Sequence, residues 1–154
     1  LKTGDKSALH LPVLMQRKAV VMPEPASTEL VPDYPMMSPP ISRRTVEKEL
    51  ATDITRFLIH EDTGLSVHPQ NGMRFQEIRR ETWQINRNDP LTLTAQAHMT
   101  SVRSRDSWDT RTEIKQRLSV DECFYFIEAE LEAYEGGQRV LRRTWEEAIK
   151  RDFT

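Results

Sequence analysis

The sequence is poor in the residues that build disulfides, zinc centres and phosphate-binding loops. Cys123 is the only cysteine among 154 residues, so neither an internal disulfide nor a cysteine cluster for zinc can form. None of the five glycines flanks a serine in the Gly-x-Ser-x-Gly spacing of a nucleophile elbow, and no Gly-rich phosphate loop occurs. We therefore expect no cofactor, no metal and no catalytic residue in this chain.

The charge balance and the hydrophobic runs exclude further classes. The net charge is −2, and positive side chains alternate with negative ones, so no basic excess indicates a nucleic-acid partner. No apolar run approaches the roughly 20 residues of a membrane helix, and no signal peptide is recognisable. We expect neither a membrane nor a nucleic-acid partner, and the lone cysteine favours a cytoplasmic setting. Because the sequence begins at Leu1, we expect a natural N-terminus to be missing.

Proline divides the chain. Six of its nine prolines lie between residues 23 and 40. Proline fixes φ and lacks a backbone donor, so we interpret residues 23–42 as a linker or a strap lying on a surface, the alternative being a segment that hangs loose. Residues 1–22 contain two short strand candidates, 9–13 and 19–22, which we assign to the end of a preceding β-sandwich. Residues 43–154 are predicted to form an antiparallel β-domain.

Alternation of side chains is the dominant pattern after residue 43. Between Trp108 and Val120, apolar and small residues fall on one face and charged residues on the other, the signature of a half-buried strand. Residues 91–102 alternate in the same way. Further strand candidates are residues 45–50, 54–60, 65–67, 74–85, 123–134 and 138–147.

The connections carry turn chemistry and leave no room for crossover helices. Gly136-Gly137 indicates a two-residue hairpin loop, and three other turn motifs separate the strand candidates. Residues 128–135 are ambiguous because they are good helix formers, but a strand fits equally well and a turn follows at once; we predict a strand, with a packed helix as the alternative. The fold class is therefore all-β, an antiparallel meander forming a sandwich or barrel-like sheet.

Few residues suggest a site. Two histidines, His60 and His98, could meet on neighbouring strands, although isolated strand histidines are more common. Asp53, Glu61 and Asp62 could supply oxygen ligands for calcium, although solvated turn carboxylates are the commoner case.

Other side chains favour a structural role. Glu128, Glu130 and Glu132 would line one strand face opposite the arginines of residues 139–143, which indicates a charged solvent face. We expect Cys123 to be a small buried hydrophobe. Tryptophans are typical of protein cores; the residues proposed for a ligand pocket or an interface are Trp83, Trp108 and Trp145.

Four short segments occur in an informative order. They are Asp89-Pro90-Leu91-Thr92, Ser107-Trp108-Asp109-Thr110-Arg111-Thr112-Glu113, Leu131-Glu132-Ala133-Tyr134-Glu135-Gly136 and Arg143-Thr144-Trp145-Glu146. In this order and spacing they resemble the C-terminal end of the CocE/NonD-type hydrolases, relatives of the X-prolyl dipeptidyl-peptidases and of bacterial acyl esterases. The similarity extends from about Leu9 to Asp152.

The resemblance implies a parent enzyme with an α/β-hydrolase domain and a Ser-His-Asp triad, none of whose residues map onto this chain. We therefore expect a non-catalytic accessory β-domain, with the catalytic domain of the same polypeptide as its partner and a homo-oligomer as a further possibility. Such a domain would support core packing, the substrate cleft or oligomer contacts. The alternative is a stand-alone β-barrel that binds a small apolar ligand in a deep, closed pocket.

Overall fold

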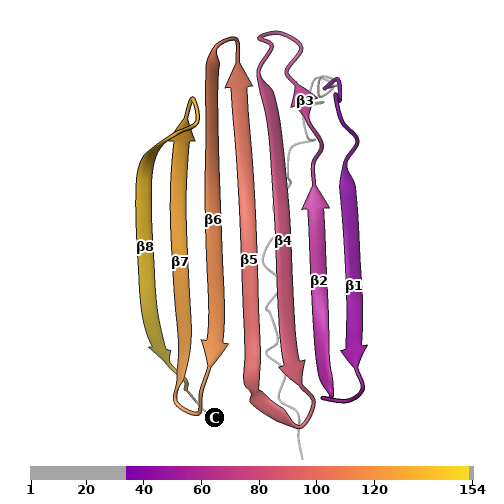
Figure 1. Cartoon of the computed structure of the whole chain (residues 1–154), viewed down its shortest axis with the longest axis vertical. Helices are drawn as coiled ribbons and strands as arrows, with labels where there is room; N and C mark the ends of the chain where they lie inside the picture. Colours follow the sequence, from indigo (N-terminus) through magenta and orange to yellow (C-terminus); the bar gives the residue numbers. More distant parts are fainter. Residues whose placement is uncertain (1–33, 153–154) are drawn as a thin grey trace, which may run out of the picture. The chain divides into compact units, whose positions relative to one another are not determined.

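The computed structural model describes residues 34–152, and these form one antiparallel sheet. The strands are β1 (Ile41–Glu49), β2 (Ile54–Asp62), β3 (Ser66–Val67), β4 (Arg74–Asn86), β5 (Asp89–Arg105), β6 (Trp108–Val120), β7 (Phe124–Glu135) and β8 (Gln138–Lys150). Their spatial order is β1-β2-β4-β5-β6-β7-β8, and the short β3 pairs with β4 (Figure 1). The predicted all-β antiparallel meander is confirmed.

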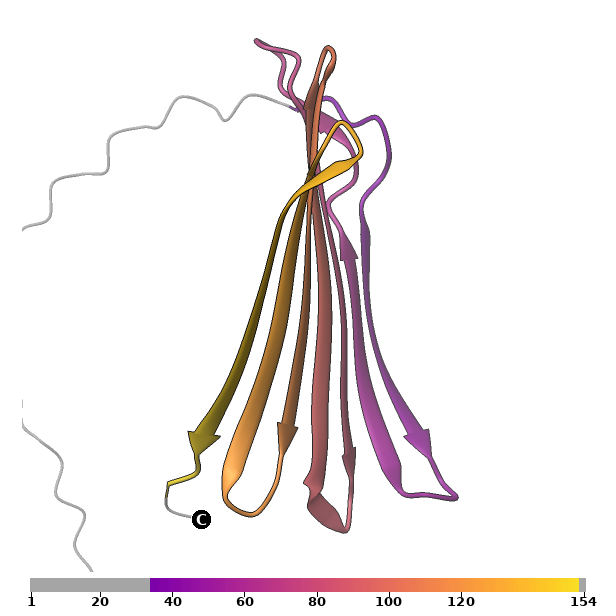
Figure 2. The ribbon, with the colours of Figure 1, turned by 60° about the vertical axis from the view of Figure 1, so that its left-hand side comes forward.

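The sheet is open and one layer thick in the described part of the chain. β1 and β8 lie at opposite edges (Figure 1), and the view in Figure 2 shows the long strands as a single twisted layer. Within residues 34–152, Ala95 in the central strand β5 is the only hydrophobic residue that is buried. A core enclosed between two layers is therefore not formed by these residues alone.

Most strands begin and end within three residues of the positions that alternation predicts, but β1 begins four residues before the predicted strand at 45–50. β6 spans Trp108–Val120 as expected, and β7 is a strand rather than the alternative helix. The helix-forming residues of β7 adopt the extended conformation because β6 and β8 pair with them on both sides. No helix is present in residues 34–152, so nothing there spans a membrane as a helix.

The predicted turns carry the backbone conformations that their residues favour. Gly136 and Gly137, between β7 and β8, have φ of 55° and 79°, and two positive φ values are the mark of a type I′ hairpin turn. Gly64 also has a positive φ, and a Cβ there would collide with the carbonyl oxygen of Ser38. The sequence motif Asp62-Thr63-Gly64 thus marks a close approach of two backbones as well as a turn.

The second backbone in this close approach is that of residues 34–40. The linker or strap predicted at 23–42 is described from residue 34 onward, and its last two residues belong to β1. Residues 34–40 lie against the segment between β2 and β4: the amide of Val67 donates to the carbonyl of Pro35 at 3.0 Å, and Leu65 donates to the hydroxyl of Ser38 at 2.8 Å. Tyr34 packs edge-on against Phe75. β1 begins at Ile41, two residues before the domain start predicted at 43. The predictions for residues 1–22 and 23–33 lie outside the described residues.

Candidate functional site: the apolar face of the sheet

The sheet has one apolar face and one polar face. Because side chains alternate along a strand and paired residues share a face, the register assigns each residue to one of them. The apolar face, named for its dominant side chains, carries Val46, Phe57, Ile59, Trp83, Ala95, Ala97, Met99, Ile114, Leu118, Ile127, Ala129, Leu131 and Trp145. The polar face carries the residues between them.

One row of the apolar face runs without interruption from β1 to β7, and on β8 it ends at Glu147. Its members pair from β1 to β7 in the order Val46, Phe57, Trp83, Ala95, Leu118 and Ile127. Several of these side chains stay accessible: Val46 is 67% exposed and Trp83 is 42% exposed. An apolar sheet face normally packs against a second layer, and a contiguous exposed apolar surface marks an interaction site. Among residues 34–152 no second layer covers this row.

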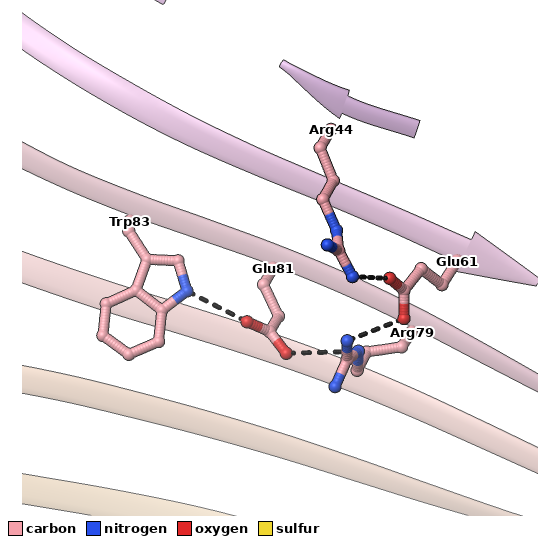
Figure 3. Close-up of polar contacts among 5 residues, drawn as sticks. All are labelled: Arg44, Glu61, Arg79, Glu81 and Trp83. Atoms are coloured by element: carbon pink, nitrogen blue, oxygen red, sulfur yellow. Dashed lines mark hydrogen bonds and ion pairs between the residues drawn. The ribbon is translucent and has the colours of Figure 1, made fainter. Parts of the chain in front are cut away.

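A charged network borders the row on β1, β2 and β4 (Figure 3). A guanidinium nitrogen of Arg44 donates to Oε1 of Glu61 at 2.6 Å, and Arg79 donates to the other oxygen, Oε2, at 2.7 Å. Arg79 also lies 3.4 Å from Glu81, whose carboxylate accepts the indole N–H of Trp83 at 2.9 Å. Two arginines and two glutamates neutralise each other, so the network adds no net charge to the apolar face.

The same network lowers the pKa of Glu61 and holds the indole of Trp83 in place. The hydrogen bond from Arg44, followed by the charge of Arg79, lowers the pKa of Glu61 below its ordinary value of 4.5. The indole N–H of Trp83 is satisfied at the edge of the ring, so its apolar surface remains available for packing. This arrangement suits an interface anchor.

The polar face is hollowed into an open groove of about 530 Å³ over β4 to β8. Its charged lining combines Arg80, Lys115 and Arg117 with Glu128, Glu130 and Glu146. Opposite charges lie on neighbouring strands there, since Arg117 pairs in register with Glu128 and Lys115 with Glu130. A second hollow of about 270 Å³ lies on the apolar face, beside Glu61 and Met99. Both are open, and neither is a closed apolar pocket.

The predicted site tryptophans are spread over the sheet. Trp83 on β4 and Trp145 on β8 lie on the apolar face with three strands between them, which puts their Cα atoms roughly 20 Å apart. Trp108 begins β6 and is 43% exposed. The structure therefore brings none of the three together around one ligand, although the register places all three on the apolar face.

The structure corrects one expectation, the burial of Cys123, and within residues 34–152 it forms neither of two less common arrangements that the sequence left open, a histidine pair and a calcium site. His60 and His98 do not occupy neighbouring strands, because β4 lies between β2 and β5 and places Arg80 between them. Cys123 is exposed in the β6–β7 turn rather than buried, since the chain reverses at Asp121 before β7 begins.

The possible calcium ligands are also separated. Asp53 precedes β2 while Glu61 and Asp62 end it, a separation of roughly 25–30 Å along an extended strand. Glu61 and Asp62 then point to opposite faces, where Glu61 binds arginines and Asp62 accepts from Gln76. No group of metal-ligating side chains is found in the described residues.

The predicted pairing of glutamates on β7 with arginines on β8 is observed in part. Glu130 pairs with Arg142 and Glu132 with Arg139, both at 2.6 Å. The hydrogen bond from Arg139, and then that from Tyr134, lowers the pKa of Glu132. Arg143 lies on the other face of the sheet, in register with Leu131.

Sequence reasoning missed the Arg44–Glu61–Arg79–Glu81 network. A signal was present: Arg79, Glu81 and Trp83 are spaced by two residues and must share a strand face. Their partners on β1 and β2 required the register, which the sequence alone does not supply.

Nothing in the described residues assembles an attacking group with its base. No hydrogen bond within residues 34–152 joins a serine, threonine or cysteine side chain to a histidine; the nearest ionisable contact is His98 to Glu113 at 3.7 Å. Comparison with protein-family models, curated proteins and solved structures finds no match. The apolar face is thus the feature on which a functional interpretation depends.

Proposed function

We propose that this chain is a non-catalytic accessory β-domain of a larger serine hydrolase, similar to the X-Pro dipeptidyl-peptidases and acyl esterases. Its apolar face packs against the catalytic α/β-hydrolase domain of the same polypeptide. The observation that carries the proposal is the row from Val46 to Ile127, which no described residue covers. The ordered sequence motifs from Asp89 to Glu146 supply the choice of enzyme family.

Physical reasoning supports an interface rather than a ligand site. Burial of apolar surface stabilises an association by about 25 cal/mol per Å², and the row extends over six strands, far more than one small molecule covers. The neutral network around Glu61 provides hydrogen-bonding groups at the border of the apolar area, as interface rims do. A stand-alone ligand-binding barrel is less well supported, because β1 and β8 do not pair and close the sheet.

The first test is the reading frame upstream of Leu1. We expect it to encode a Gly-x-Ser-x-Gly elbow followed by the remaining triad residues. The purified 154-residue chain should show no hydrolysis of p-nitrophenyl esters or X-Pro p-nitroanilides. A frame that opens with methionine beside Leu1, or turnover that is lost on mutation of a serine or histidine of this chain, contradicts the proposal.

The second test uses a matched pair of variants on β4 in the full-length polypeptide. Trp83→Lys places a charge on the apolar face, whereas Thr82→Lys places it on the polar face of the same strand. We expect Trp83→Lys to loosen the contact between the domains, so that limited proteolysis releases the β-domain faster, and Thr82→Lys to leave the proteolysis rate near that of the wild type. Equal release from the two variants argues against docking through the apolar face.

A further inference from the structure

Strand β8 presents a long free edge. It ends the strand order, pairs only with β7 among the described strands, and all of its residues are exposed. Outward-facing N–H and C=O groups of such an edge are a template for another strand. β8 extends over 13 residues, so an added strand would meet a long row of unpaired backbone groups.

Charges are distributed unequally along this edge. The first half carries Arg139, Arg142 and Arg143, and the second half carries Glu146 and Glu147 with Lys150 at its end. A second copy of β8 running antiparallel about Thr144 places Arg142 opposite Glu146 twice, once on each side of the centre. The same register places Arg143 opposite the exposed indole of Trp145, a favourable cation–π pair.

Three of these groups have no ion-pair partner within residues 34–152: Arg143, Glu146 and Glu147. In the antiparallel arrangement Glu146 faces Arg142 of the other copy, and Glu147 lies diagonally opposite Arg143. Arg142 keeps its contact with Glu130 and shares its guanidinium with the new carboxylate. The added strand therefore supplies partners for charges that the described sheet leaves without one.

The opposite edge lacks this property. β1 is shorter, with nine residues, and most of its charges are paired within the sheet. Arg44 binds Glu61, Lys48 lies near Asp53, and Glu49 lies near Arg56. Self-pairing of β1 would compete with these contacts.

We propose that the protein forms a two-fold symmetric dimer in which β8 pairs antiparallel with β8 of a second copy about Thr144. The contact is isologous, since the Arg142–Glu146 pair occurs twice, once on each side of the two-fold axis. Residues opposite each other across the two-fold axis share a sheet face, so both apolar faces lie on one side of the joined sheet. The dimer therefore leaves the apolar face free, and it is independent of the proposed accessory function.

The test is a charge exchange on β8, followed by sedimentation velocity of the 154-residue chain. The first double variant, Arg142→Glu with Arg143→Glu, makes the centre of the edge wholly acidic. The second, Glu146→Arg with Glu147→Arg, makes it wholly basic. Each double variant should dimerise at least about tenfold more weakly than the wild type, because like charges then face each other. An equimolar mixture of the two should restore a dimer, because opposite charges then face each other at 142 and 146 and lie diagonally opposite at 143 and 147.

The controls separate this contact from association through the apolar face. Arg43→Glu with Glu47→Arg exchanges charges on β1 and should leave the dimer unchanged. Trp83→Lys should also leave it unchanged, and added salt should weaken the dimer rather than strengthen it. A wild-type chain that is monomeric, an association insensitive to both β8 variants, or folded variants that fail to combine on mixing would each overturn the proposal.

Discussion

At the residue scale, Glu61 is the centre of the polar network beside the apolar row. It accepts from two arginines on different strands, Arg44 and Arg79, and so links β1, β2 and β4. Its neighbour on the chain, Asp62, turns to the other face and binds Gln76. Two adjacent carboxylates thus have unrelated environments because strand geometry alternates their directions.

Glu61→Gln should lower stability modestly at neutral pH and not at all in acid. The lowered pKa of Glu61 means that the folded state favours the charged carboxylate. The stabilisation of the folded state by this charge is therefore present above the unfolded pKa near 4.5, and it is lost as the pH falls through the lower folded pKa. Urea midpoints of the two proteins should differ at pH 7 and converge in acid, once the pH lies below the folded pKa of Glu61.

Glu47→Gln is the matched control for that comparison. Glu47 lies on the polar face of β1 and has no ion-pair partner within the described residues. Its replacement should leave the urea midpoint near that of the wild type at both pH values. A pH-independent gap for Glu61→Gln would mean that packing, and not ionisation, accounts for its effect.

At the element scale, most of the sheet could be predicted from alternation and turn residues. β6 was predicted at its observed bounds, and the Gly136-Gly137 hairpin has the predicted turn conformation. The register and the partners of Arg44 and Arg79 could not be predicted, because period two defines two faces but not which strand lies beside which. The prediction that Cys123 is buried is wrong. Its apolar neighbours Phe124 and Phe126 belong to β7, whereas Cys123 lies in the turn before that strand.

Gly137→Ala should destabilise the β7–β8 hairpin. Gly137 has φ of 79°, and an added Cβ meets nothing within 4 Å, so the cost comes from the backbone conformation alone. A left-handed conformation costs a non-glycine residue about 1–2 kcal/mol. Thermal and urea unfolding should report a loss of that size.

Gly136→Asn provides the comparison, since asparagine tolerates a left-handed conformation and favours the first position of a type I′ turn. Its stability should remain close to that of the wild type. If both variants are equally destabilised, the turn is not of this type in solution.

At the scale of the whole molecule, the sheet buries little apolar surface for its size. The heat-capacity change of unfolding follows the apolar area that unfolding exposes. Differential scanning calorimetry of the 154-residue chain should therefore give a value below the ~12–15 cal/mol/K per residue that is usual for globular proteins. A value inside that range would show that the apolar face is already covered in the chain by itself.

The apolar row also has a consequence for the proposed docking to a catalytic domain. Each of six strands contributes a single residue to it, from Val46 on β1 to Ile127 on β7. No hairpin on its own displays more than a small part of the contact surface. The proposed docking therefore requires all six strands to be aligned in their final register. A partner that binds this row would thereby distinguish a finished sheet from a half-assembled one and leave incomplete chains unbound.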